Sequence, residues 1–249
     1  MVDTDEKKAL QHCVSQSLHV SEKKAVALSS EREKSLWQAA KVYGFQRGFQ
    51  WHYEAILRAV RARADRFAMI FDFEKLLIDG RVLPPVILSE GPVTSVPSDT
   101  FARRVEARYR IVKKARIVSM APRFDSYLHA DTVVLQPNPA FQPKNRKERA
   151  LWEEAVRDGW EEGERHARNY FDEAMQRLTT EFRGILLCKR LTKLGLVSLP
   201  LLDHEHVGIE VGNDLLSMNQ DIFRLLLPAS FRYGVRECAF SILVPYAIS

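Results

Sequence analysis

The tetrapeptide Asp203-His204-Glu205-His206 has the most suitable composition in this sequence for holding a metal ion. Imidazole and carboxylate groups are common ligands of zinc and related divalent metals. In a strand, His204 and His206 would point to the same side, because side chains alternate along it. The sequence has no second group of ligands nearby, however, and four unlike residues in one short segment are typical of a solvated turn. We therefore expect no metal and no cofactor, with His204 and His206 as weak candidates.

Familiar catalytic motifs are missing from the sequence. It contains no GxSxG, GxxxxGKS/T, GxGxxG or HExxH, so the usual nucleophile, phosphate-binding and zinc-protease sites lack their anchors. The adjacent carboxylates Glu161 and Glu162 stand near Arg165, at the spacing of ordinary ion pairs on a helix surface. We expect no catalytic residue and no small-molecule substrate. A small hydrolase with an unrecognised site remains an alternative.

A basic stretch between residues 103 and 116 is suited to an acidic partner. It contains Arg103, Arg104, Arg108, Arg110, Lys113, Lys114 and Arg116. The formal net charge of the whole chain is only +5, which favours acidic partners without identifying one. Charges at alternating positions of a strand share one solvated face, and this is the interpretation that we favour. The alternative function is a cytoplasmic nucleic-acid-binding protein that uses residues 103–116.

The cysteines and tryptophans also have simple structural interpretations. Cys13, Cys188 and Cys238 are far apart and odd in number, so they form neither a zinc motif nor a fully paired disulfide set. We expect Cys188 in the core. The four tryptophans, at positions 37, 51, 152 and 160, coincide with apolar helical stripes, which favours core packing over a ligand-stacking surface.

Two long helices must position all of these groups. Apolar residues recur at three- and four-residue steps from about Glu31 to Ala64 and again from Arg146 to Leu194, the period of a helix face. At 1.5 Å per residue the second helix would be about 70 Å long, so it either kinks or protrudes. Gly195 predicts its end, because glycine commonly closes a helix.

Each predicted helix carries two glycines four residues apart on its apolar face. These are Gly44 with Gly48 and Gly159 with Gly163. A glycine inside a soluble helix destabilises it by about 1 kcal/mol relative to alanine, so two such pairs indicate very close packing at these positions. We expect the two helices to pack on each other there.

The remaining segments have β character. Val105, Ala107, Tyr109 and Ile111 alternate with charged residues, the period of a half-buried strand, and residues 115–118 predict a second strand. Residues 207–211, 215–218 and 222–227 predict a three-stranded meander. The sequence therefore predicts an α+β fold, with two long helices packed together and two small antiparallel β regions.

The strongest indication of function comes from several local segments of this sequence. They are Arg47–Tyr53, Ile70–Phe73, Pro84–Glu90, Ala115–Arg123, Pro143–Asn145, Gly159–Gly163 and Phe182–Gly184. In order and spacing they resemble the DotC family of type IVB outer-membrane-complex lipoproteins, known as TraI in conjugative plasmids of the I group. The likeness runs from about Leu36 to Pro228. We accordingly divide the chain into an N-terminal extension (1–30), whose flexibility the sequence leaves open, a DotC-like domain (31–234) and a C-terminal tail (235–249).

The resemblance implies a structural protein without enzymatic activity. Members of the family join a DotD-like lipoprotein and a DotH-like protein in the outer-membrane ring, and they help to place the DotH-like partner at the outer membrane. We therefore expect this chain to assemble within a ring in the periplasm of a Gram-negative bacterium. Whether the machine transports DNA or effector proteins stays open.

This sequence departs from the family at its start. The first residues are too polar for a secretory signal peptide, and Cys13 follows Leu10-Gln11-His12, which is no lipobox. We expect Cys13 not to be the acylated cysteine.

Partner binding is expected at the β regions and the chain end rather than on the helices. Residues 82–91, 207–227 and 240–244 are apolar, extended and punctuated by proline or glycine, so they can leave strand edges free for another chain. Ile209 and Val211 are our candidate partner-binding residues.

Overall fold

The computed structural model describes residues 2–18, 30–98, 101–130, 139–211, 214 and 216–232. The chain forms two compact units. Unit 1 comprises residues 1–68 and 124–177, and unit 2 comprises residues 69–123 and 178–249. The predicted domain over residues 31–234 contributes to both units. Cys238, residues 240–244 and the rest of the tail from residue 235 lie outside the described residues.

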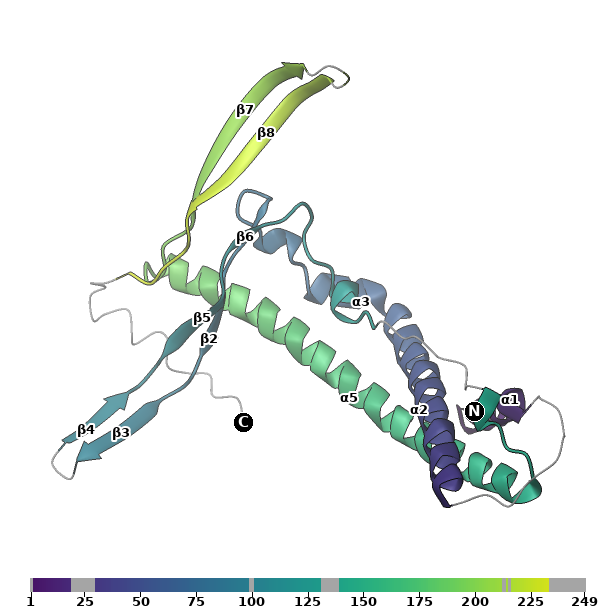
Figure 1. Ribbon diagram of the computed structural model, residues 1–249. Helices are drawn as coiled ribbons and strands as arrows, with labels where there is room; N and C mark the ends of the chain where they lie inside the picture. Colours follow the sequence, from purple (N-terminus) through teal and green to yellow (C-terminus); the bar gives the residue numbers. More distant parts are fainter. Residues whose placement is uncertain are drawn as a thin grey trace. The chain divides into compact units, whose positions relative to one another are not determined.

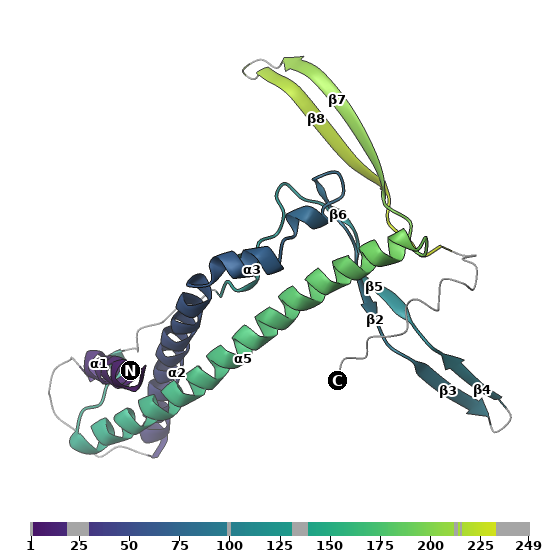
Figure 2. The ribbon, with the colours of Figure 1, turned by 180° about the vertical axis from the view of Figure 1, so that it is seen from behind.

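Unit 1 is helical (Figures 1 and 2). It contains α1 (Val2–Leu18), α2 (Ser30–Arg61), most of α3 (Ala64–Ile70), the short α4 (Phe124–Tyr127), the 3-10 turn η2 (Pro139–Phe141) and the first part of α5 (Arg146–Lys193). Both long predicted helices exist, and the end of α5 lies within one residue of the prediction. The α2 and α5 helices pack together, and α1 adds to their core. The predicted α+β class is confirmed.

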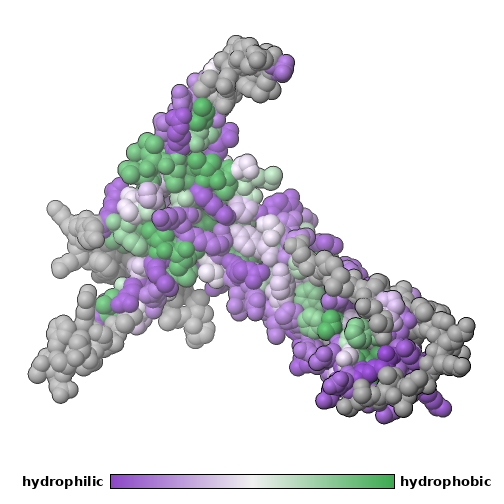
Figure 3. All heavy atoms as spheres, in the orientation of Figure 1, coloured by the Kyte–Doolittle hydropathy of each residue, from purple (hydrophilic) through white to green (hydrophobic). Residues whose placement is uncertain are grey.

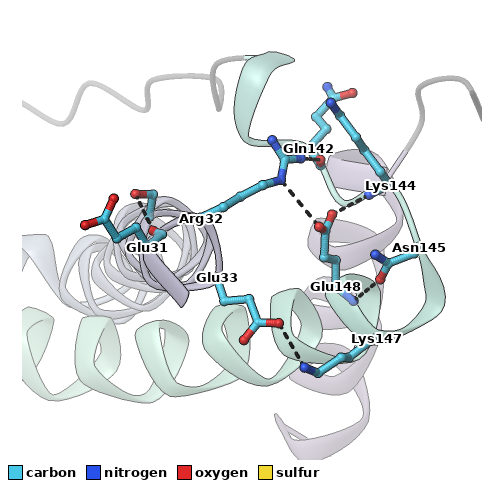
Figure 4. Close-up of polar contacts among 9 residues, drawn as sticks. Glu31, Arg32, Glu33, Gln142, Lys144, Asn145, Lys147 and Glu148 are labelled. Carbon is cyan, nitrogen blue, oxygen red and sulfur yellow. Dashed lines mark hydrogen bonds and ion pairs between the residues drawn. The ribbon is translucent and has the colours of Figure 1, made fainter. Parts of the chain in front are cut away.

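The start of α5 is defined by polar groups that cap it (Figure 4). The Asn145 side chain accepts a hydrogen bond from the Glu148 N–H at 2.7 Å, and Glu148 Oε2 accepts one from the Lys144 N–H, also at 2.7 Å. These bonds satisfy backbone donors at the helix start. Arg32 of α2 lies 3.4 Å from the other Glu148 oxygen, so the same buried carboxylate also joins the two helices.

The core of unit 1 contains tryptophan and tyrosine side chains. Trp152 is fully buried and Trp160 nearly so, and both pack with Leu36 and Tyr43 of α2. Trp37 and Trp51 are half-buried against the same cluster. Core packing of the tryptophans is therefore confirmed.

Unit 2 consists of antiparallel strand pairs with the last turns of α5. The pairs are β1 (Val82–Leu83) with β6 (Arg116–Ile117), β2 (Val86–Ser89) with β5 (Tyr109–Lys113), β3 (Val93–Ser98) with β4 (Phe101–Val105), and β7 (Leu201–Val211) with β8 (Leu216–Leu227). The short 3-10 turn η1 (Glu74–Leu76) precedes them. Gly195 has a φ of 74°, a conformation that favours glycine, and it follows the last turn of α5 as predicted.

The core of unit 2 lies where α5 meets β2. Ile87, Cys188 and Leu191 are buried together there, so the predicted core position of Cys188 is confirmed. Gly184 allows the close approach, because an added Cβ would lie 3.0 Å from the Ile87 carbonyl oxygen. Buried Glu181 pairs with Lys113, and its other oxygen is 3.6 Å from Arg116.

Two strand predictions were wrong. The single strand predicted over residues 105–111 is interrupted, because β4 ends at Val105 and β5 begins at Tyr109. Its alternation of half-buried and exposed residues is nevertheless present. The three-stranded meander is also wrong, since its second and third strands are parts of the single strand β8. Periodicity detects alternating burial, but it does not show where a strand pairs.

Candidate partner-binding surface

The β7–β8 hairpin is the longest β structure among the described residues. Its register runs from the pair Leu201–Leu227 at the base to the pair Val211–Leu216 near the tip. Within the described part of the chain, neither strand has a second hydrogen-bonded neighbour. Both outer edges therefore carry backbone donors and acceptors that suit an added strand. An isolated two-stranded hairpin is marginally stable in water, so a partner strand would also stabilise it.

Large hydrophobic side chains are exposed around the base of this hairpin. Leu201 is 51% exposed, and Leu226 and Leu227 are 55% and 58% exposed. Leu199 and Phe231 are exposed on the flanking segments. Figure 3 shows hydrophobic residues gathered at this end of the hairpin. We call these five residues the basal patch. An exposed apolar group of this kind commonly marks a protein interaction site.

A cavity of about 290 Å³ lies beside the basal patch. It is lined by Pro84, Pro85, Cys188, Leu199 and Ala229, among others. Lys189 and Lys193 from the last turns of α5 also contribute to its wall. The cavity is thus largely apolar with two cations in its lining, a suitable recess for an apolar side chain of a binding segment.

The polar middle of the hairpin contains the two histidines considered for metal binding. They lie in β7 and not in a turn, so the predicted turn was wrong. His204 Nε2 and His206 Nδ1 are 2.9 and 3.0 Å from the same Asp221 oxygen on β8. Their hydrogen bonds lower the pKa of Asp221 below its usual range. The His204 ring also stacks on the Phe223 ring, at 4.4 Å between ring centres. The Arg81 guanidinium lies 4.5 Å from the centre of the Phe223 ring. These contacts join the two histidines of β7 to β8.

Ile209 and Val211, the candidate partner-binding residues, lie in the distal part of β7. Their backbones are paired with those of Met218 and Leu216. The structure does not describe their side chains, so their part in binding stays a prediction. At the opposite end of the hairpin, the exposed Leu226 and Leu227 belong to the segment 207–227 that the sequence indicated for partner binding. Leu199, Leu201 and Phe231, the other members of the basal patch, lie outside that segment and were not identified from sequence.

The four helical glycines lie where α2 and α5 touch in unit 1. An added Cβ would lie 2.8 Å from Val156 Cα at Gly44 and 2.6 Å from the Trp160 carbonyl oxygen at Gly48. At Gly159 and Gly163 it would lie 2.8 and 2.6 Å from backbone nitrogens of α2. Side chains larger than hydrogen do not fit at these distances. The glycines thus allow the close packing of α2 on α5.

The basic stretch is partly neutralised within unit 2. Glu90 Oε1 is 2.8 Å from Arg110, and its other oxygen is 3.8 Å from Arg108. Lys113 and Arg116 both face Glu181. Ion pairs of this kind leave fewer of these cations available for phosphates.

Together these features define an α+β protein with a tightly packed helical unit and a β unit that presents a hairpin with unpaired edges. A model of the TraI family, described as type IV secretory system, conjugal DNA-protein transfer, matches residues 30–237. The chain therefore belongs to this type IV secretion family. None of the curated proteins matches it. Within the described residues, no helix is long and apolar enough to span a membrane.

Proposed function

We propose that this protein is a structural subunit of a type IVB secretion or conjugation apparatus. It would belong to the outer-membrane ring complex, face the periplasm and help to place a DotH-like partner at the outer membrane, beside a DotD-like protein. It would act by binding proteins and not by catalysis. Membership of the type IV secretion family supports the machine, while the DotC resemblance motivates the position in the ring.

The observation that carries this proposal is the β7–β8 hairpin with its basal patch. The apolar faces of α2 and α5 are already used in the core of unit 1. In contrast, the hairpin offers unpaired edges and exposed leucines. A ring subunit needs such surfaces, because it must contact neighbours on more than one side.

The test is co-purification from cells that express the tagged full chain with a DotH-like and a DotD-like protein of the same system. We expect both proteins to be captured at a constant ratio, also in about 0.5 M salt. At this salt concentration the Debye length is below about 5 Å, so weak attraction between exposed charges is screened. A nucleic-acid contaminant that bridged the proteins would dissociate as salt rises.

The binding surface is tested by the variant that carries both Ile209→Lys and Val211→Lys, and by a second variant without residues 235–249. We expect capture of the DotH-like protein to fall in at least one of these. The matched control carries Glu153→Lys and Glu154→Lys on the exposed face of α5. Loss of capture in the control alone, with folding retained, would assign binding to the helices and refute our assignment of the surface. Failure of the unaltered chain to capture either partner would refute the proposed function.

A further inference from the structure

Three helices of unit 1 bring one histidine and two glutamates together. Glu6 comes from α1, His52 from α2 and Glu164 from α5. Their ligand atoms all lie within 4.8 Å of one another. His52 Nε2 is 3.4 Å from Glu6 Oε1 and 3.8 Å from Glu164 Oε2. The two carboxylates therefore face the same imidazole nitrogen from two different helices.

One nitrogen of the buried imidazole has no hydrogen bond. His52 is 8% exposed, and its Nε2 has no hydrogen-bond partner. The ring contacts both Trp51 and Trp160, at 4.8 and 5.8 Å between ring centres. A buried polar atom without a partner is destabilising by about 1–3 kcal/mol, so its position between two carboxylates requires an explanation.

The surroundings of His52 suit a metal ligand. Its Nε2 faces both carboxylates, and the imidazole nitrogen of a neutral histidine has a lone pair available for a metal. Arg168 binds Glu164 Oε1, which leaves Oε2 directed at His52 and orients the carboxylate. Supporting contacts of this kind are usual around metal ligands.

We propose that Glu6, His52 and Glu164 bind a divalent transition-metal ion with the preferences of Zn²⁺. Metal–ligand bonds of 2.0–2.2 Å at tetrahedral angles place ligand atoms about 3.3–3.6 Å apart. The Glu6–His52 distance of 3.4 Å fits this range. Glu164 Oε2, at 3.8 Å from His52 and within 4.8 Å of the Glu6 ligand atom, would have to approach by a few tenths of an ångström or more. An imidazole with two carboxylates suits zinc better than the all-oxygen shells of Mg²⁺ or Ca²⁺. Water would fill the fourth position.

Such an ion has a structural consequence beyond the proposed function. It would join α1 to the α2–α5 pair through one ligand from each helix. The α1 helix already packs on this core through Cys13, and the ion would hold it in one position. Metal binding would thus stabilise unit 1 and order its N-terminal helix.

The test is calorimetric titration of the metal-free full chain with ZnCl₂. We expect one ion to bind each chain at this site, together with a rise in the melting temperature and a change in tryptophan fluorescence, because Trp51 and Trp160 contact His52. Glu6→Gln should weaken binding by at least about tenfold, since even changes to supporting residues around a metal have that effect. The Glu6 side chain is 29% exposed, so this variant is expected to fold. His52→Gln should abolish the fluorescence change.

The hairpin histidines provide the matched control. A variant with both His204→Gln and His206→Gln lacks the two hairpin histidines but keeps His52. It should keep the fluorescence change and the Glu6-dependent binding. Zinc binding that persists unchanged in Glu6→Gln and His52→Gln would overturn the proposal. Binding that disappears only in the hairpin variant would assign the ion to β7 instead. Absence of any zinc-dependent stabilisation would show that the cluster is only a buried ion-pair network.

Discussion

Gly48 of α2 packs directly on the backbone of Trp160 in α5. An added Cβ would lie 2.6 Å from the Trp160 carbonyl oxygen and 2.8 Å from its Cα. Because these atoms belong to a helix backbone, they cannot move aside as a flexible side chain would. The two helices can therefore approach this closely only while position 48 has no side chain.

Substitution of this glycine should destabilise unit 1. Gly48→Ala gains up to about 1 kcal/mol of helix propensity, but overpacking should cost about 1–3 kcal/mol, and we expect a net loss of stability. All four tryptophans of the chain lie in unit 1, so the denaturant dependence of tryptophan fluorescence measures its free energy of unfolding. Asn169→Ala, at an exposed position of α5, is the control and should be neutral or slightly stabilising. Equal stability of Gly48→Ala and the control would contradict the close packing.

Loss of the Glu181 charge should destabilise unit 2. Glu181 is 3% exposed, whereas its partners Lys113 and Arg116 are largely in water. In Glu181→Gln the two cations can be hydrated, so we expect a loss of about 1–3 kcal/mol rather than the larger penalty of a fully buried pair. Hydrogen exchange of the amides paired between β2 and β5 would measure it. Glu106→Gln, at an exposed position, should leave this exchange unchanged. The prediction fails if the amides between β2 and β5 exchange at the same rate in Glu181→Gln and in Glu106→Gln.

The Cys13 thiol should make unit 1 less stable at alkaline pH. Burial raises the pKa of Cys13 from 9.0 to about 11. A raised pKa in the folded state contributes stability below pH 9, and this contribution is lost as the pH rises from 9 through 11. The free energy of unfolding of the unaltered chain should therefore fall more steeply over this range than that of Cys13→Val, which has no thiol to titrate. Parallel pH profiles of the two proteins would argue against a buried, protonated thiol.

The basal patch should be needed for partner capture and dispensable for folding. Leu201 and Leu227 are register partners, and both are more than half exposed. A variant with Leu201→Lys and Leu227→Lys should change stability by only about 0.5 kcal/mol, yet reduce capture of the DotH-like protein at least tenfold. The control exchanges charge on the polar middle of the hairpin, through Glu205→Lys, and should bind normally. Undiminished capture by the leucine variant would exclude the patch from the interface.

The local parts of this fold could be predicted from the sequence. The α5 helix was predicted over residues 146–194 and spans Arg146–Lys193, because helical periodicity depends on residues three and four apart and Gly195 ends it locally. The same local pattern placed Trp152 and Trp160 in a core. Close helix packing was also predictable, since paired glycines inside helices are unfavourable unless another backbone lies beside them.

Only the tertiary structure decided which polar side chains of separate helices meet. Glu6, His52 and Glu164 belong to three separate helices, and no spacing in the sequence connects them. The exposure of Leu199 and Leu201 was equally hidden, because an apolar run looks the same whether it is buried or presented to a partner. Strand pairing is harder to predict than a helix face, because it depends on contacts between segments that are distant in the sequence.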